Sequence, residues 1–129
     1  MIAAYSKSKH GNLKVSNNFR VKEFACNDGT DPVFICRTLV FILQKVRDHF
    51  KKPVTINSGY RTPIYNAKVK GAALSQHLYG RAADISVEGV APQEVYDFVC
   101  ALMPDMGGVG LYPTFVHIDT RAEKSRWKG

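Results

Sequence analysis

The sequence predicts a single domain over residues 1–129 that mixes helices with strands. Its 129 residues are 45% hydrophobic, which is sufficient for one core of its own. No repeat or low-complexity segment divides the chain. Apolar residues recur at helical spacing in two segments, and they alternate with polar residues in several shorter ones.

The longest predicted element is a helix from about Asp31 to Phe50. Asp31 is suited to cap this helix, and Pro32 is suited to its first position. Pro53 ends it. The apolar stripe of the helix consists of Ile35, Leu39, Ile42, Val46 and Phe50. This stripe predicts packing against the core and no chemical role.

Short strands are predicted where apolar and polar side chains alternate. The first covers residues 54–57, and Pro63 begins a short helical turn soon after it. Two later strands cover residues 82–87 and 115–119, the second of them approached through a glycine-rich segment. A second helix is predicted between them, over residues 91–103. The basic end, "RAEKSRWKG", is expected to fray.

The two later strands each carry polar side chains on one face and aliphatic side chains on the other. Asp84 lies on the polar face of the first, and His117 and Asp119 lie on that of the second. If these strands are neighbours in one sheet, their polar faces coincide. His77, just before the bend expected at Gly80, can then fold over the same face.

Two imidazoles and one carboxylate are a suitable ligand set for a catalytic zinc ion, which has three protein ligands and one position for water. Such a site could hydrolyse an amide. The alternatives are that His77 is a hydrogen-bonded surface residue and that Asp84 caps the end of a strand. His10 and His49 are interpreted as residues outside any metal site.

Composition excludes some classes of protein. The net charge is +7, but the basic residues are scattered and no basic run is interleaved with aromatic residues, so we expect no nucleic-acid partner. No apolar run is long enough to span a membrane or to serve as a signal peptide. The three cysteines include no Cys-x-x-Cys pair, which argues against a zinc ribbon or redox motif.

Three blocks of sequence resemble the zinc D-Ala-D-Ala carboxypeptidase family, which shares a superfamily with lysostaphin-type peptidases and the hedgehog signalling domain. The blocks are "SGYR" at Ser58 to Arg61, "SQHLYGRAAD" at Ser75 to Asp84, and a histidine in a late strand, His117. The leader "NNFRVKEFACNDG" resembles the start of small phage-borne and prophage-borne members. The resemblance covers nearly the whole chain.

This resemblance implies an α+β fold in which helices pack on an antiparallel sheet. It also implies that His77, Asp84 and His117 bind Zn²⁺. Arg61 would reach the carboxylate or the scissile carbonyl of the substrate, and Ser75 would support the site through a hydrogen bond. Tyr60 and Tyr112 are interpreted as packing residues.

The chain departs from its relatives at the usual position of the general base. Several relatives carry an acidic residue three positions before the last ligand or a histidine two before it, where this chain has Thr114 and Phe115. Asp119 shares a strand face with His117 and is therefore the candidate base. Alternatively, it orients a ligand histidine or pairs with Arg121.

The predicted function is zinc-dependent hydrolysis of amide bonds in peptidoglycan stem peptides, by a monomer acting as a carboxypeptidase or an endopeptidase. The protein would be made in a bacterial or phage-infected cytoplasm without a signal peptide and would act on the cell wall, as a phage or prophage lysin does. The alternative is a non-catalytic module that keeps the fold and binds a wall fragment or a protein. A nucleic-acid-binding domain is supported by charge alone.

Overall fold

The computed structural model describes residues 1–129 and has an α+β fold built on a 5-stranded sheet with strand order β5-β6-β8-β7-β9. The strands of this sheet are β5 (Val54–Ser58), β6 (Ala82–Val87), β7 (Gly108–Leu111), β8 (Val116–Asp119) and β9 (Ser125–Lys128). Neighbouring strands are antiparallel, except that β9 runs parallel to β7. The antiparallel sheet predicted from the sequence is confirmed.

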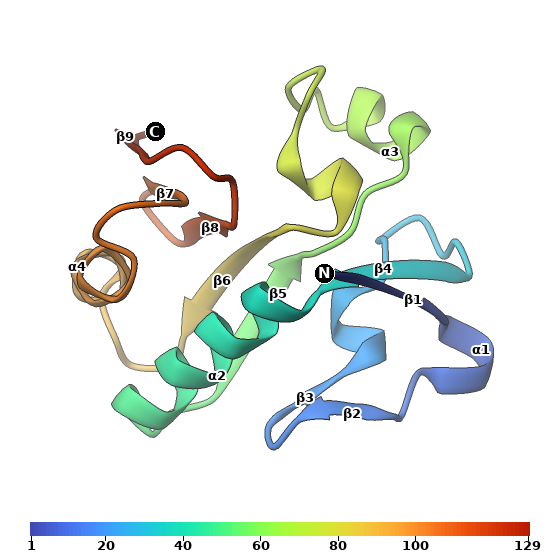
Figure 1. Cartoon of the computed structure of the whole chain (residues 1–129), viewed down its shortest axis with the longest axis horizontal. Helices are drawn as coiled ribbons and strands as arrows, with labels where there is room; N and C mark the ends of the chain where they lie inside the picture. Colours follow the sequence, from blue (N-terminus) through green and yellow to red (C-terminus); the bar gives the residue numbers. More distant parts are fainter.

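Two helices cover one face of this sheet and leave the other face free for a site. They are α2 (Arg37–Phe50) and α4 (Pro92–Leu102), and both contact β6 (Figure 1). Leu43 and Val46 of α2 are fully buried with Ile85 and Ile118 of the sheet. Burial of this kind contributes roughly 1.5–3 kcal/mol per large aliphatic side chain. No helix combines the length and apolar character needed to cross a membrane.

The N-terminal part forms two smaller sheets beside the main one (Figure 1). One pairs β1 (Ile2–Ser6) with β4 (Pro32–Cys36), and the other pairs β2 (Lys14–Ser16) with β3 (Phe19–Arg20). The remaining elements are short: α1 (Lys7–His10), η1 (Val21–Phe24), α3 (Pro63–Lys68) and η2 (Gln76–Tyr79). Of these, η2 matters most, because it carries His77.

The long helix begins five residues later than the sequence predicted, at Arg37 rather than Pro32. Residues 32–36 form β4 instead, because they pair with β1 along its whole length. Asp31 does not cap α2. Its carboxylate accepts hydrogen bonds from Ser6 Oγ (2.7 Å) and from the backbone N–H of Ser8 (2.8 Å), which ties it to α1. The expected end of the helix at Phe50 is confirmed.

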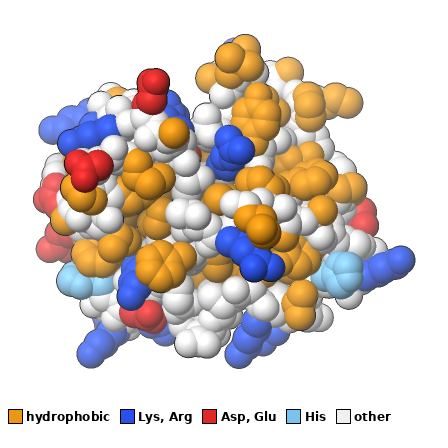
Figure 2. All heavy atoms as spheres, viewed as in Figure 1, with side chains coloured by type: hydrophobic (Ala, Val, Ile, Leu, Met, Phe, Trp, Pro, Cys, Tyr) orange, Lys and Arg blue, Asp and Glu red, His pale blue; other side chains and the backbone are white.

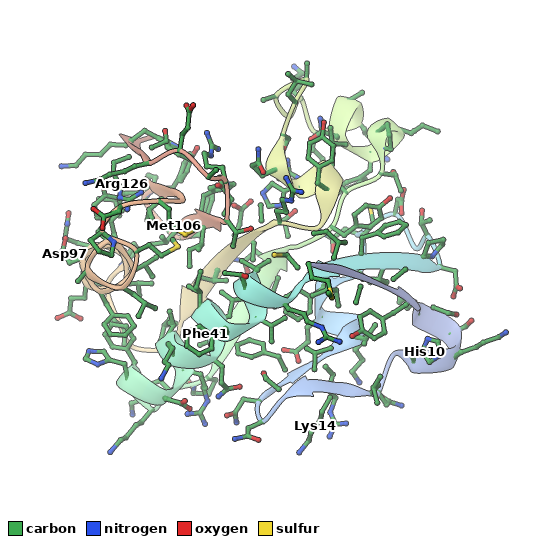
Figure 3. The ribbon with its side chains drawn as sticks, viewed as in Figure 1. His10, Lys14, Phe41, Asp97, Met106 and Arg126 are labelled. Atoms are coloured by element: carbon green, nitrogen blue, oxygen red, sulfur yellow. The ribbon has the colours of Figure 1, made fainter.

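The C-terminal segment was expected to fray, and this expectation was wrong. Residues 125–128 form β9, held by backbone pairing with β7. The Arg126 guanidinium also donates to the carbonyl oxygens of Gly107 (2.5 Å), Met106 (3.2 Å) and Met103. Figure 3 labels Arg126 and Met106, which lie close together. The glycine-rich approach to the last predicted strand is itself a strand, β7, and its Gly110 lies against the Trp127 ring, which leaves no room for a Cβ atom.

Candidate metal centre

The register between β6 and β8 brings the two predicted strand ligands together. Asp84 pairs directly with His117, and the flanking pairs are Ala83 with Ile118 and Ile85 with Val116. Because side chains alternate along a strand, Asp84 and His117 share one face while Ile85 and Ile118 enter the core on the other. The polar faces of the two strands therefore coincide, as the sequence predicted.

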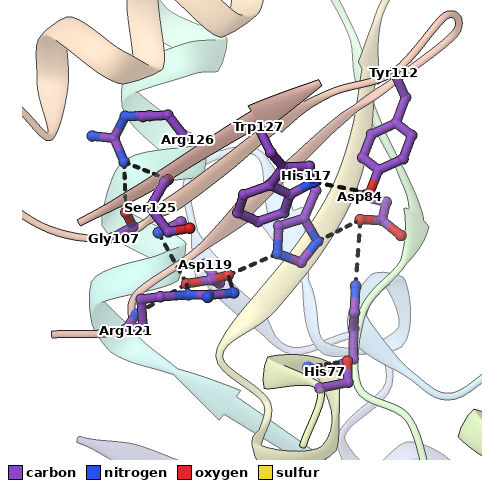
Figure 4. A network of polar contacts seen from close by, with 12 residues as sticks. His77, Asp84, Gly107, Tyr112, His117, Asp119, Arg121, Ser125, Arg126 and Trp127 are labelled. Carbon is purple, nitrogen blue, oxygen red and sulfur yellow. Dashed lines mark hydrogen bonds and ion pairs between the residues drawn. The ribbon is translucent and has the colours of Figure 1, made fainter. Parts of the chain in front are cut away.

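The third predicted ligand, His77, lies on the short turn η2. The Ser75 hydroxyl accepts a hydrogen bond from the backbone N–H of His77 (3.2 Å), and Gly80 ends the turn with a φ of 69°. That left-handed conformation suits glycine. Ser75 therefore acts on the backbone that carries His77 rather than on its ring. The His77 side chain is buried and turned toward the sheet (Figure 4).

The three side chains converge around one point. His77 Nε2 lies 3.3 Å from Asp84 Oδ1, His117 Nδ1 lies 3.0 Å from the same oxygen, and all three ligating atoms lie within 4.8 Å of one another. Tetrahedral ligands bound to zinc at about 2.0–2.1 Å lie about 3.3 Å apart. The spacings of the two nitrogens from Asp84 Oδ1 thus fit a small tetrahedral cation.

The far nitrogen of each imidazole is also fixed by a hydrogen bond. His77 Nδ1 lies 2.7 Å from the Gly59 carbonyl oxygen, and His117 Nε2 lies 2.8 Å from Asp119 Oδ2. A carbonyl and a carboxylate only accept, so these nitrogens carry the hydrogens. His77 Nε2 and His117 Nδ1 face Asp84 and are the nitrogens that would each present a lone pair to a bound cation. Hydrogen bonds of this kind orient metal-binding histidines in proteins.

Asp119 is fully buried, and its carboxylate is saturated with donors. Oδ1 accepts from the backbone N–H groups of Gly108 (3.0 Å) and Arg121 (3.1 Å) and from Arg121 Nε (2.9 Å). Oδ2 accepts from His117 Nε2 and from an Arg121 terminal nitrogen (2.7 Å). Burial alone would raise the pKa of Asp119, but the hydrogen bonds from His117 and Arg121 hold it well below its usual range.

Asp84 is likewise kept ionised. Burial would raise its pKa, and the hydrogen bonds from His117 and His77 outweigh that effect and lower it. Burial would lower the pKa of His117, yet the hydrogen bonds to Asp119 and Asp84 raise it overall. The centre therefore holds an anionic oxygen ligand beside two histidines.

Arg61 lies at the edge of this centre, in the segment that follows β5. One terminal nitrogen is 3.4 Å from Asp84 Oδ2 and the other is 3.3 Å from Asn66 Oδ1, while Nε donates to Ser58 Oγ (3.1 Å). Asn66 is buried and also donates to the Ala72 carbonyl oxygen (2.9 Å). The guanidinium is thus aimed at the metal face by neighbouring polar groups.

A cleft of about 560 Å³ opens above His77, Asp84 and His117, and it corresponds to the notch at the upper edge of Figure 2. Arg61 and the segment around Leu74 line one side, and Tyr112, Phe115 and Trp127 line the other. Asp84 is the only carboxylate among the lining residues. A second groove of about 440 Å³, between β2 and α2, has no histidine, cysteine or carboxylate in its lining.

Residues 14–119 match the peptidase M15 family. The chain belongs to this family. The match bears out the resemblance to zinc D-Ala-D-Ala carboxypeptidases, whereas the resemblance to phage-borne members stays a prediction.

Among curated relatives of this M15 chain is the peptidoglycan L,D-endopeptidase MepK of Escherichia coli K12. It is 43% identical over 77 residues, which cover 54% of this chain and 41% of the relative. The probable MepK of Haemophilus influenzae is 36% identical over 83 residues, or 59% of this chain and 43% of the relative. The zinc D-Ala-D-Ala carboxypeptidase of Streptomyces albus G is 50% identical over 34 residues, or 26% and 13%. The chain thus spans less than half the length of these relatives.

Sequence reasoning missed how the C-terminal strand contributes to the M15 site. The Trp127 ring lies 5.2 Å from the His117 ring and 5.3 Å from the Arg121 guanidinium. Trp127 is the only tryptophan in the chain, and it pairs with Gly110 of the glycine-rich strand β7. Two features of the sequence indicated this contact: a single large tryptophan, and a strand whose alternating glycines leave room for its ring.

The proximity of Trp127 to His117 makes metal binding directly observable. We predict that Zn²⁺ added to the metal-free protein changes the Trp127 emission and saturates at one equivalent. His117→Ala should weaken zinc binding by more than the roughly 100-fold typical of losing an outer hydrogen-bond partner. His10→Ala is the matched control. Because His10 lies on α1, far from the site, this variant should bind zinc like the parent. Equal affinity in the His117 and His10 variants would exclude His117 as a ligand.

Proposed function

We propose that this chain is a zinc-dependent peptidase that hydrolyses amide bonds in the stem peptides of peptidoglycan. The observation that carries the proposal is the convergence of His77 Nε2, Asp84 Oδ1 and His117 Nδ1 in an open cleft of an M15 chain. The ligand types and their spacing suit zinc. The names of the relatives, an L,D-endopeptidase and a zinc carboxypeptidase, support this substrate class.

Bound zinc would supply a Lewis acid and a water molecule of lowered pKa. Residues of the chain would bind the substrate. Arg61, beside Asp84 on the cleft wall, would bind the substrate carboxylate or the scissile carbonyl. The net charge of +7 favours approach to anionic wall polymers. We propose that the protein acts on the wall as a monomer, as a phage or prophage lysin would.

For Asp119, the geometry favours orientation of His117 over proton transfer. A general base needs a free lone pair near the water, whereas both Asp119 oxygens already accept hydrogen bonds. We therefore propose that Asp119 holds the His117 ring so that Nδ1 faces the metal. Arg121 in turn holds Asp119.

A non-catalytic module that binds wall fragments is the second candidate function. It is favoured because Asp84, itself a proposed ligand, is the only carboxylate that lines the cleft, so no second carboxylate is available there as a base. Both candidates require the cleft to bind stem peptides, but only the first predicts turnover.

Defined muropeptides distinguish these two functions. We expect the zinc-loaded protein to release fragments that mass spectrometry identifies as products of amide hydrolysis. A chelator should abolish release and added Zn²⁺ should restore it, because the water is activated by the metal. His77→Ala should be inactive. Binding of muropeptides without any product would establish the non-catalytic module instead.

Arg61→Lys is expected to reduce kcat/KM by about 100-fold with zinc affinity unchanged, because lysine keeps the charge but lacks the planar fork of donors. Steady-state kinetics on one muropeptide, with zinc content measured in parallel, checks this result. Arg37→Lys is the control, because Arg37 is an exposed residue at the start of α2 and does not line the cleft. An Arg61→Lys enzyme as active as the parent would contradict the proposed role.

Asp119→Asn separates orientation from base catalysis. If Asp119 orients His117, the variant should bind zinc about 10- to 100-fold more weakly and recover activity in excess metal. If it is the base, zinc affinity should persist while hydrolysis is lost at every metal concentration. Asp97→Asn on the exposed side of α4 serves as the control, and thermal unfolding checks that both variants remain folded.

A further inference from the structure

The Tyr112 side chain is fixed on several sides at the end of β7. Its ring stacks on Phe115 with centroids 4.5 Å apart and an interplanar angle of 6°. The indole Nε1 of Trp127 donates a hydrogen bond to the Tyr112 hydroxyl oxygen (3.0 Å). Gly129, whose N–H donates to the Leu111 carbonyl oxygen (2.8 Å), lies directly against the ring. Packing alone would explain the fixed ring but not the position of its hydroxyl group.

The hydroxyl hydrogen of Tyr112 has no acceptor within the chain. An indole N–H can only donate, so the phenol oxygen accepts from Trp127 and keeps its own hydrogen for another partner. Tyr112 and Trp127 both line the cleft above the metal ligands. The cleft therefore contains a hydrogen-bond donor that is held in place before any ligand binds.

The strand order places this donor opposite Arg61. Across the sheet, Arg61 follows the edge strand β5, Asp84 lies on β6 and His117 on β8, and Tyr112 follows β7. Both Arg61 and Tyr112 line the cleft. A peptide that reaches the metal ligands thus lies between a guanidinium on one side and a phenol on the other.

We infer that the Tyr112 hydroxyl donates a hydrogen bond to the scissile carbonyl oxygen of the bound peptide, and that this bond strengthens as the oxygen gains negative charge. The inference rests on the proposed function. No proton is transferred, because the phenol keeps its hydrogen throughout. A donor fixed in advance stabilises developing charge without reorganisation. Arg61 is then free to bind a carboxylate of the substrate.

Trp127 is the positioning residue for this donor. Its N–H fixes the Tyr112 oxygen, and its ring also lies against His117, 5.2 Å away. Gly110 on β7 leaves the space that the indole occupies. The C-terminal strand β9 thus links the donor to the metal centre.

The test is Tyr112→Phe in the zinc-loaded full-length protein, assayed on a defined muropeptide. We expect kcat to fall about 10- to 100-fold with KM little changed, since the lost bond acts mainly in the transition state. Zinc affinity, measured by competition with a chromophoric chelator, and thermal stability should stay at parent values. Tyr79→Phe is the matched control, because Tyr79 is 45% exposed and outside the cleft lining, and it should leave kcat unchanged.

The outcomes separate this inference from the proposed function. A parent that is active, with a Tyr112→Phe variant equally active or affected in KM alone, overturns the role of Tyr112 and leaves the peptidase intact. A parent that hydrolyses no muropeptide when loaded with zinc overturns the proposed function and the inference with it.

Trp127→Phe tests the positioning role. It keeps an aromatic ring near His117 and removes the N–H donor to Tyr112 together with the second ring of the indole. We expect a smaller loss of kcat than in Tyr112→Phe, and a double variant no slower than Tyr112→Phe alone. Losses that add in the double variant would overturn the role assigned to Trp127.

Discussion

The centre depends on one pairing in the sheet, that of Asp84 with His117 across β6 and β8. A shift of either strand by one residue would turn its ligand into the core and bring an aliphatic side chain to the polar face. The register is fixed by the buried residues between the ligands and the helices, chiefly Ile85, Val116 and Ile118, which pack in the core that α2 and α4 cover. Core packing therefore determines where Asp84 and His117 lie, although no core side chain takes part in the chemistry.

The groups around this pairing offset the cost of burying charge. Removing an ion from water costs several kcal/mol unless partners compensate. Asp119, with none of its surface exposed, is compensated by the Arg121 guanidinium, by His117 and by the Gly108 N–H. The same hydrogen bonds leave His117 Nδ1 facing Asp84. Stability and ligand orientation thus arise from one network.

The alternation of side chains along the strands was the feature of the site that could be predicted from the sequence. It predicted that Asp84, His117 and Asp119 share a face, because a period of two needs no knowledge of distant segments. It did not identify which role Asp119 plays, since this depends on Arg121 and on the backbone of β7. Helical periodicity found α4 and the end of α2. The start of α2 was missed because β4 forms only by pairing with β1, a contact between distant segments.

The C-terminal strand was missed for a similar reason. The segment "RAEKSRWKG" has the local features of an exposed end, and it becomes a strand through parallel pairing with β7 and through the Arg126 contacts to the loop after α4. Because Trp127 belongs to this strand, its position in the site was missed as well. Parallel pairing across intervening elements leaves little trace in local sequence, which explains why the place of Trp127 in the cleft was found only in three dimensions.

The central claim is that two imidazoles and one carboxylate bind zinc through defined atoms. An anomalous difference map from crystals of the zinc-loaded protein tests it most directly. Zinc bound in this way should give one strong peak about 2.0–2.2 Å from His77 Nε2, Asp84 Oδ1 and His117 Nδ1. A peak elsewhere, such as at His10 or His49, or bound by His117 through Nε2, would contradict it.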